Sequence, residues 1–140
     1  MKILQICNKP PFPSVDGGTM AMQNLSEALS IQKHQVKIIA LNTPKHFSRI
    51  EKIDKEIREK FSIEYFFINT KITFFNTLFN LFTSKSFHAS RFYGNKIAEQ
   101  INLIIENENF DLVILDSLFC GVYLKSIKKN IQGKDSIKST

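Results

Sequence analysis

Residues 2–41 read KILQICNKPPFPSVDGGTMAMQNLSEALSIQKHQVKIIAL, and this stretch decides the fold. Its two ends, Lys2–Cys7 and Val36–Leu41, are short apolar runs, which predicts two buried β-strands. Between them, apolar residues recur at helical spacing after Thr19, a residue type that caps helices. A strand, a helix and a second strand in so short a stretch predict a βαβ unit, with parallel strands and a right-handed crossover.

The same alternation of strands and helices continues along the chain. Apolar runs predict a third strand at Ile63–Ile68 and a fourth at Asp111–Leu115. Helical spacing or composition predicts further helices at Lys45–Lys60, Phe74–Phe82, Arg91–Asn107 and Leu118–Lys129. The sequence therefore predicts an α/β fold, with a doubly wound, mainly parallel sheet and helices on both faces. The polar tail, residues 130–140, is expected to be frayed.

The composition fits a single folded domain with a basic surface. Of the 140 residues, 43% are hydrophobic, with 13 Phe and no Trp, which is enough apolar material for a core. The net charge of +6 favours anionic partners such as nucleotide phosphates, although the same charge can serve solubility alone. No nucleic-acid recognition motif occurs in the sequence, so we expect no nucleic-acid partner.

The cysteines and the first residues indicate a cytoplasmic protein. Cys7 and Cys120 lie in or beside apolar runs and do not form a CxxC pair, which predicts buried, reduced thiols. No apolar run is long enough to span a bilayer, and Met1–Cys7 is too short for a signal peptide. No cluster of His, Cys and carboxylates has metal-ligand spacing, so we expect no metal and no cofactor.

The loop after the first strand, residues 8–18, is the first candidate ligand site, because parallel sheets bind ligands beyond the carboxyl ends of their strands. Its three prolines stiffen the backbone. Gly17 and Gly18 leave room for a ligand at a helix start, where free N–H groups favour phosphate. A tight turn without a ligand explains the two glycines as well. The spacing matches neither a GxGxxG dinucleotide fingerprint nor a Walker A loop.

Polar residues follow the other predicted strands at the same edge of the sheet. The segments concerned are 42–45, 69–71 and 116–120. The candidate contacts to an acceptor or to phosphate are Lys9, His46, Asp116 and Ser117. Asp116 is also a candidate helix cap. His34 and His88 are weaker candidates, because both fit exposed positions between elements.

The order of these segments resembles the opening of glycosyltransferase family 4, whose members have the GT-B fold of two Rossmann-like domains. The residues that carry the resemblance are Lys2-Ile3-Leu4, Pro11-Phe12-Pro13, Asp16-Gly17-Gly18, Leu25–Leu29, His34-Gln35-Val36, Ser90–Tyr93 and Phe110–Ile114. The resemblance covers residues 1–129 and rests on pattern and order more than on any single diagnostic motif.

The resemblance implies the N-terminal, acceptor-side domain of a retaining glycosyltransferase. Such an enzyme moves a sugar from a nucleotide-sugar to a glycan or lipid-linked acceptor, usually in polysaccharide biosynthesis. Gly17 and Gly18 would face the donor diphosphate, and Asp16 would meet the sugar or an acceptor hydroxyl. The donor-binding domain with its paired glutamates is absent from these 140 residues. We therefore expect a truncated domain that is inactive alone and could self-associate.

Two departures from the family pattern affect these expectations. Lys33 replaces the usual glycine before His34, so the helix must end with Lys33 in the left-handed conformation, at ~1 kcal/mol, or with another cap. Asp116 and Ser117 stand where many members carry a His, which puts a His-based role there in doubt.

The aromatic segment 74–91 and the glycine loop each allow a second interpretation. Phe74, Phe75, Phe79, Phe82, Lys85 and Arg91 combine apolar and basic side chains. This mixture suits peripheral contact with the inner face of the cell membrane, while a helix that packs on the sheet explains it as well. The glycine loop also suits a non-catalytic α/β domain that binds a nucleotide or anion for regulation.

Overall fold

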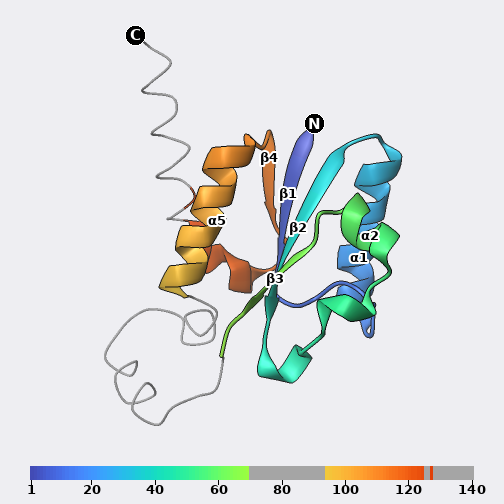
Figure 1. Cartoon of the computed structure of the whole chain (residues 1–140), viewed down its shortest axis with the longest axis horizontal. Coiled ribbons are helices and arrows are strands. Elements are labelled where there is room, and N and C mark those ends of the chain that lie inside the picture. Colours follow the sequence, from blue (N-terminus) through green and yellow to red (C-terminus); the bar gives the residue numbers. More distant parts are fainter. Residues whose placement is uncertain (70–93, 125–126, 128–140) are drawn as a thin grey trace.

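The structure is a computed structural model that describes residues 1–69, 94–124 and 127 (Figure 1). Its strands are β1 (Lys2–Cys7), β2 (Gln35–Asn42), β3 (Glu64–Phe67) and β4 (Leu112–Leu115). Its helices are α1 (Gly17–Ile31), α2 (Lys55–Lys60) and α5 (Asn95–Glu108), with short 3-10 helices η1 (Pro44–His46), η2 (Ile50–Lys52) and η3 (Leu118–Tyr123).

The four strands form one parallel sheet in the order β3-β2-β1-β4. One of the two inner strands is β1, in which Ile6 pairs with Ile39 of β2 and with Leu115 of β4. From β1 the chain builds outward through β2 to β3, and then returns to add β4 on the other side of β1. This is the strand order of Rossmann-like sheets, so the predicted doubly wound α/β fold is confirmed.

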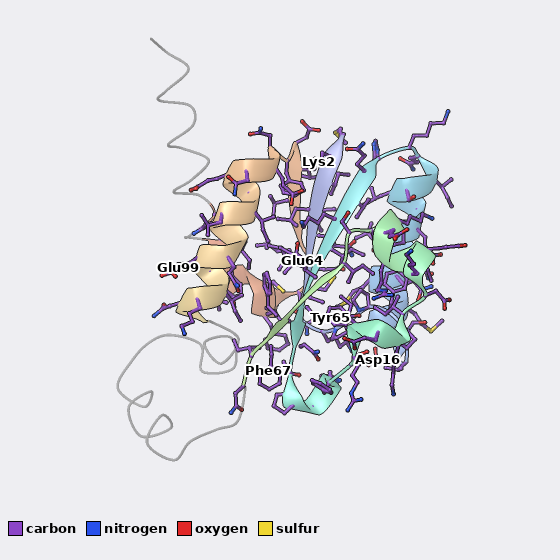
Figure 2. All side chains as sticks on the ribbon, viewed as in Figure 1. Lys2, Asp16, Glu64, Tyr65, Phe67 and Glu99 are labelled. Atoms are coloured by element: carbon purple, nitrogen blue, oxygen red, sulfur yellow. The ribbon has the colours of Figure 1, made fainter. Side chains whose placement is uncertain are left out.

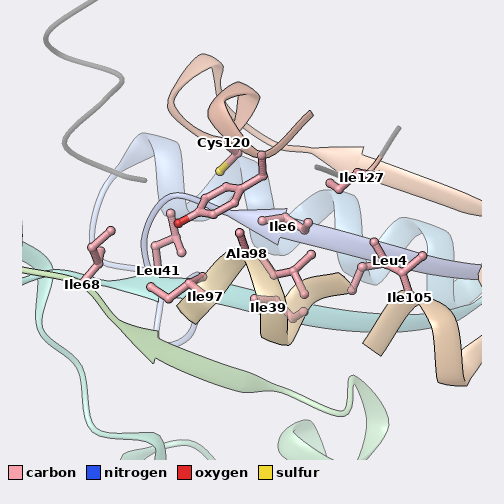
Figure 3. Close-up of a cluster of buried hydrophobic side chains, with 12 residues drawn as sticks. Leu4, Ile6, Ile39, Leu41, Ile68, Ile97, Ala98, Ile105, Cys120 and Ile127 are labelled. Carbon is pink, nitrogen blue, oxygen red and sulfur yellow. The ribbon is translucent and has the colours of Figure 1, made fainter. Parts of the chain in front are cut away.

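Helices cover both faces of the sheet: α1 and α2 lie on one side, and α5 and η3 lie on the other (Figure 1). Side chains alternate between these faces along β1, so that Leu4 and Ile6 join the core under α5 while Cys7 joins the core under α1. Figure 3 shows the core under α5, where Ile97 and Ala98 meet strand residues. Because both faces are covered, the strands need apolar residues at nearly every position.

Gln5 is a polar residue of β1, and it is fully buried. Its side-chain oxygen accepts a hydrogen bond from the Ser26 hydroxyl at 2.7 Å, and its Nε2 donates to the Asp116 carboxylate at 2.6 Å and to the Met22 carbonyl at 3.2 Å. The network satisfies the buried amide and ties α1 to the end of β4.

The start of α1 differs from the prediction that Thr19 caps this helix. The helix begins at Gly17, and Asp16 is the N-cap, whose carboxylate accepts from the Thr19 backbone N–H at 2.8 Å. The Thr19 hydroxyl in turn accepts from the Asp16 backbone N–H at 2.9 Å. Thr19 is therefore the reciprocal partner in a capping box rather than the cap itself.

The C-terminal end of α1 follows the expectation for Lys33. Lys33 has a φ of 63°, the left-handed conformation that a glycine would adopt more easily. The Lys33 N–H bonds to the Ser30 carbonyl and the His34 N–H bonds to the Leu29 carbonyl, at 2.9 and 3.1 Å. This pair of bonds is a Schellman motif, which ends the helix without glycine.

The predicted single helix over Lys45–Lys60 is wrong, because the segment forms η1, η2 and α2 as three short pieces. The buried Asn42 side chain binds both the carbonyl and the N–H of Ser48, at 2.6 and 3.0 Å, and so holds a loop where the helix was expected. Ile53 and Phe61 still reach the core under α1. The helical spacing therefore identified these buried residues correctly, but it did not predict that the helix is interrupted.

The other predicted strands are confirmed with small shifts of their boundaries, as is the helix predicted at Arg91–Asn107, which is described as α5 from Asn95 to Glu108. Leu118–Tyr123 forms a 3-10 helix rather than the start of the predicted α-helix. The predicted helix Phe74–Phe82 and the tail 130–140 lie outside the described residues. Among the helices that the structure describes, none has the length and apolar character needed to cross a membrane.

Candidate functional site

The loop between β1 and α1 is anchored to the core through Phe12. This side chain is buried and stacks on Phe61, with ring centroids 5.5 Å apart and an interplanar angle of 24°. The Tyr65 hydroxyl donates to the Phe12 carbonyl at 2.8 Å. Burial raises the pKa of Tyr65, so its hydroxyl keeps the proton that this bond requires. The loop is thus held firmly at the carboxyl edge of the sheet.

Lys9 and Asp16 form an ion pair across the start of α1. The Lys9 ammonium lies 2.8 and 2.6 Å from the two Asp16 carboxylate oxygens. These bonds, followed by the bond from the Thr19 N–H, lower the pKa of Asp16 to about 2, so the carboxylate is charged at neutral pH. Both carboxylate oxygens of Asp16 thus have partners in Lys9 and Thr19.

The two glycines of the loop have different surroundings. A methyl group added at Gly18 would lie 3.1 Å from the Lys9 ammonium and 3.3 Å from an Asp16 oxygen, so Gly18 makes room for the ion pair. A methyl group added at Gly17 would meet nothing within 4 Å. None of the described glycines has a positive φ, so the backbone does not require glycine at position 17. Gly17 is exposed, so the space in front of it is open to solvent and to a ligand.

A pocket of about 690 Å³ opens beside this turn. One wall comes from the loop and from α1, and the other comes from the segment that follows β2. The lining residues are Lys9, Pro10, Pro13, Val15, Thr19, Lys45, His46, Phe47, Ser48, Arg49 and Lys52. Four of them are Lys or Arg and none is a carboxylate, so the described part of the lining is strongly cationic.

The pocket brings together two of the predicted contacts, Lys9 and His46. Burial lowers the pKa of His46, and the positive charges of Lys9 and Lys45 lower it further against the opposing effect of Asp16. His46 is therefore neutral at pH 7, and its ring can both donate and accept a hydrogen bond.

Asp116 and Ser117, the other two predicted contacts, do not line the pocket. Asp116 accepts hydrogen bonds from Gln5 at 2.6 Å and from the Cys7 thiol at 3.8 Å. The helix-cap alternative for Asp116 is wrong, since the Ser117 hydroxyl caps η3 by accepting from the Phe119 N–H at 3.2 Å. The structure therefore gives both residues structural contacts at the end of β4.

The predicted buried thiols are present at Cys7 and Cys120, and both cysteines are free. Burial raises the pKa of Cys7 well above its usual value and that of Cys120 to about 12, with the nearby Asp116 charge adding to both shifts. Thiolate is therefore scarce at neutral pH, which makes either residue a poor nucleophile or metal ligand.

Sequence reasoning missed Arg49 and Lys52, because both were assigned to an exposed helix. The available signal was position: these cations follow β2 closely, and the ends of parallel strands are where ligands bind. His34 lies at the opposite edge of the sheet, where its Nδ1 is 3.4 Å from the Met1 amino group.

The residues of the membrane hypothesis, Phe74, Phe75, Phe79, Phe82, Lys85 and Arg91, lie outside the described residues, as does His88. Within residues 1–69, 94–124 and 127, no group of His, Cys, Asp and Glu could hold a metal ion. Comparison of the chain with protein-family models, curated proteins and solved structures gave no match. The resemblance to glycosyltransferase family 4 thus stays a prediction from the sequence.

Proposed function

We propose that this chain is the N-terminal, acceptor-side domain of a retaining glycosyltransferase. Its Gly17-Gly18 turn faces the diphosphate of a nucleotide-sugar that a second domain holds. The observation that carries the proposal is the open space in front of Gly17 at the start of α1, on the carboxyl edge of a Rossmann-like sheet.

The start of α1 suits a diphosphate for electrostatic reasons. The first N–H groups of a helix have no carbonyl partner within it, and the helix dipole places partial positive charge there. Asp16 takes the Thr19 N–H and leaves those of Gly17 and Gly18 to a ligand. The Asp16 charge would repel a phosphate, but Lys9 neutralises it.

Sugar transfer builds negative charge on the departing diphosphate, so fixed N–H donors at this position stabilise the transition state more than the ground state. The pocket beside the turn lies where an acceptor could approach the same diphosphate. His46 lines it in the neutral form, which can hold an acceptor hydroxyl by a hydrogen bond.

Titration of the chain with inorganic pyrophosphate, followed by NMR of the backbone amides, tests the turn. We expect the Gly17 and Gly18 amide signals to shift, and Gly17→Val to abolish those shifts because its side chain fills the open space. Gly121→Val is the matched control: a methyl group at Gly121 also meets nothing within 4 Å, but Gly121 lies in η3. Unchanged glycine signals at saturating pyrophosphate would contradict the proposal.

An assay for sugar transfer separates this function from a regulatory one. We expect the 140-residue chain alone to transfer no sugar from any nucleotide-sugar, since it supplies only one side of the donor site. Measured turnover would disprove this. Micromolar binding of a free nucleotide by the chain alone would instead favour a non-catalytic nucleotide-binding domain.

A further inference from the structure

The basic pocket described above has more positive charge than its own residues neutralise. Within residues 1–69, 94–124 and 127, only Lys9 of its four Lys and Arg side chains has a carboxylate partner, which is Asp16. Among the described residues, the other ion pairs involve Lys2, Lys37 and Lys55. Lys45, Arg49 and Lys52 therefore bring three positive charges to the pocket without a carboxylate partner in the described part of the chain.

These three cations stand on a segment that is held in place. The Asn42 side chain, buried at the end of β2, binds the N–H and the carbonyl of Ser48. The Thr43 hydroxyl caps η1 by accepting from the His46 N–H at 3.3 Å. The Phe47 ring packs edge-to-face on Phe67 of β3, with centroids 6.3 Å apart. Charges that only serve solubility need no such bracing, whereas a binding site gains affinity from it.

The shape of the site argues against the alternative that these cations are ordinary surface charge. The three cations line one pocket instead of being scattered over separate parts of the surface. Its volume of about 690 Å³ lies within the range of small-molecule pockets. Lysines supply point charges and Arg49 supplies a planar fork, a combination that suits phosphate oxygens.

We infer that this pocket binds a ligand that carries a phosphomonoester or pyrophosphate group, held by Lys45, Arg49 and Lys52. The inference rests on the proposed function in one respect. If the chain is a glycosyltransferase domain, the ligand of this pocket is an acceptor that carries a phosphate group. This phosphate site is separate from the proposed diphosphate site at the turn, because Gly17 and Gly18 do not line the pocket.

The pyrophosphate titration tests this pocket separately from the turn. We expect the amide signals of residues 45–52 to shift with their own dissociation constant. The variant Lys45→Gln/Arg49→Gln should weaken that constant about tenfold, the loss typical of charge-assisted bonds to phosphate. Both side chains are exposed, so the fold should survive, and the unchanged signals of α5 will report this.

The matched control is Lys55→Gln/Lys96→Gln, which removes the same charge from exposed positions outside the pocket. We expect it to change the constant by less than about twofold, since distant surface charges are screened by salt. Equal weakening by both double variants, or no response of residues 45–52, would overturn the inference. Gly17→Val should leave the response of the pocket intact, so the pocket and the turn can fail independently.

Vesicles distinguish the two sources of such a phosphate group. Phosphatidylcholine vesicles with and without phosphatidic acid are sedimented with the chain and with Lys45→Gln/Arg49→Gln. Binding that needs both phosphatidic acid and the two cations assigns the pocket to a lipid headgroup. Pyrophosphate binding without vesicle binding assigns it to a soluble phosphorylated ligand.

Discussion

The two edges of the sheet use charge in opposite ways. At the amino edge, the Lys37 ammonium lies 2.7 Å from a Glu64 carboxylate oxygen and also binds the Glu108 carboxylate. The Lys2 ammonium lies 3.0 Å from the other Glu108 oxygen. Two cations meet two carboxylates there. At the carboxyl edge, the Lys9–Asp16 pair lies beside a pocket lined by further cations. Figure 2 shows Lys2 and Asp16 at these opposite edges.

We infer that the paired charges at the amino edge stabilise the fold, whereas the pocket cations at the carboxyl edge bind a ligand. Burial alone would raise the pKa of Glu108, but hydrogen bonds from Lys37 and Lys2 outweigh it and the pKa falls. Burial likewise would lower the pKa of Lys37, and its bonds to Glu108 and Glu64 raise it. No carboxylate among the described residues forms an ion pair with Lys45, Arg49 or Lys52. The net charge of +6 does not reveal this division, which depends on placement.

Removal of Lys37 should have the largest effect, and it should fall on stability. Its side chain is 11% exposed and serves two carboxylates, which are 42% and 31% exposed and therefore partly screened by water. We expect Lys37→Met to lower the free energy of unfolding by about 1–3 kcal/mol. Urea denaturation measures this.

Lys2→Met is the matched control at the same edge, since the Lys2 side chain is 34% exposed and should contribute less than about 1 kcal/mol. Neither variant should change pyrophosphate binding. If Lys37→Met left the free energy of unfolding unchanged, the ion pairs of Lys37 at the amino edge would not stabilise the fold.

Substitution of Asp16 at the carboxyl edge should affect both the stability of the fold and the binding of pyrophosphate. Asp16→Ala removes the N-cap of α1 and should lower the free energy of unfolding. Asp16→Asn keeps a good capping residue while it releases Lys9, so stability should change little and pyrophosphate should bind several-fold more tightly.

Acid should erase whatever stability the Asp16 charge adds over the Asp16→Asn variant. The folded pKa of Asp16, about 2, is below its ordinary value of 3.8, so its stabilising contribution is complete above 3.8 and is lost as the pH falls toward 2. Urea denaturation of both proteins across this pH range measures the loss. Weaker pyrophosphate binding by Asp16→Asn would contradict the view that Lys9 is partly consumed by its ion pair.

The smallest expected effect concerns the titration of His46, followed by NMR of its ring. Its pKa in the folded protein should lie below 6.5, so the fold favours the neutral ring and loses stability as the pH falls from 6.5 through that pKa. Lys45→Gln should raise the pKa by relieving repulsion, and bound pyrophosphate should raise it as well. Burial, the larger cause, will remain in both cases, and a pKa that falls on addition of pyrophosphate would place the anion elsewhere.

The order of elements was predictable because short-range patterns carry it. The mainly apolar runs at Lys2–Cys7 and Val36–Leu41 need both faces of a sheet covered, which indicates the parallel α/β class. Lys9 and the Gly17-Gly18 turn were also within reach, since they directly follow the first strand. Helical spacing over Lys45–Lys60 predicted one continuous helix wrongly. Ile53 and Phe61 are buried in the same core, but Ile53 follows η2 and Phe61 follows α2.

By itself, the sequence determined the fold class and the carboxyl-edge position of the glycine loop, both of which follow from neighbours along the chain. Only the tertiary structure decided which charges are paired. Lys37 binds Glu108, which is 71 positions away in the sequence, and Arg49 lines the same pocket as Lys9. Electrostatic energy depends on distance in space, so a pattern read along the chain cannot separate a closed ion cluster from an open basic pocket.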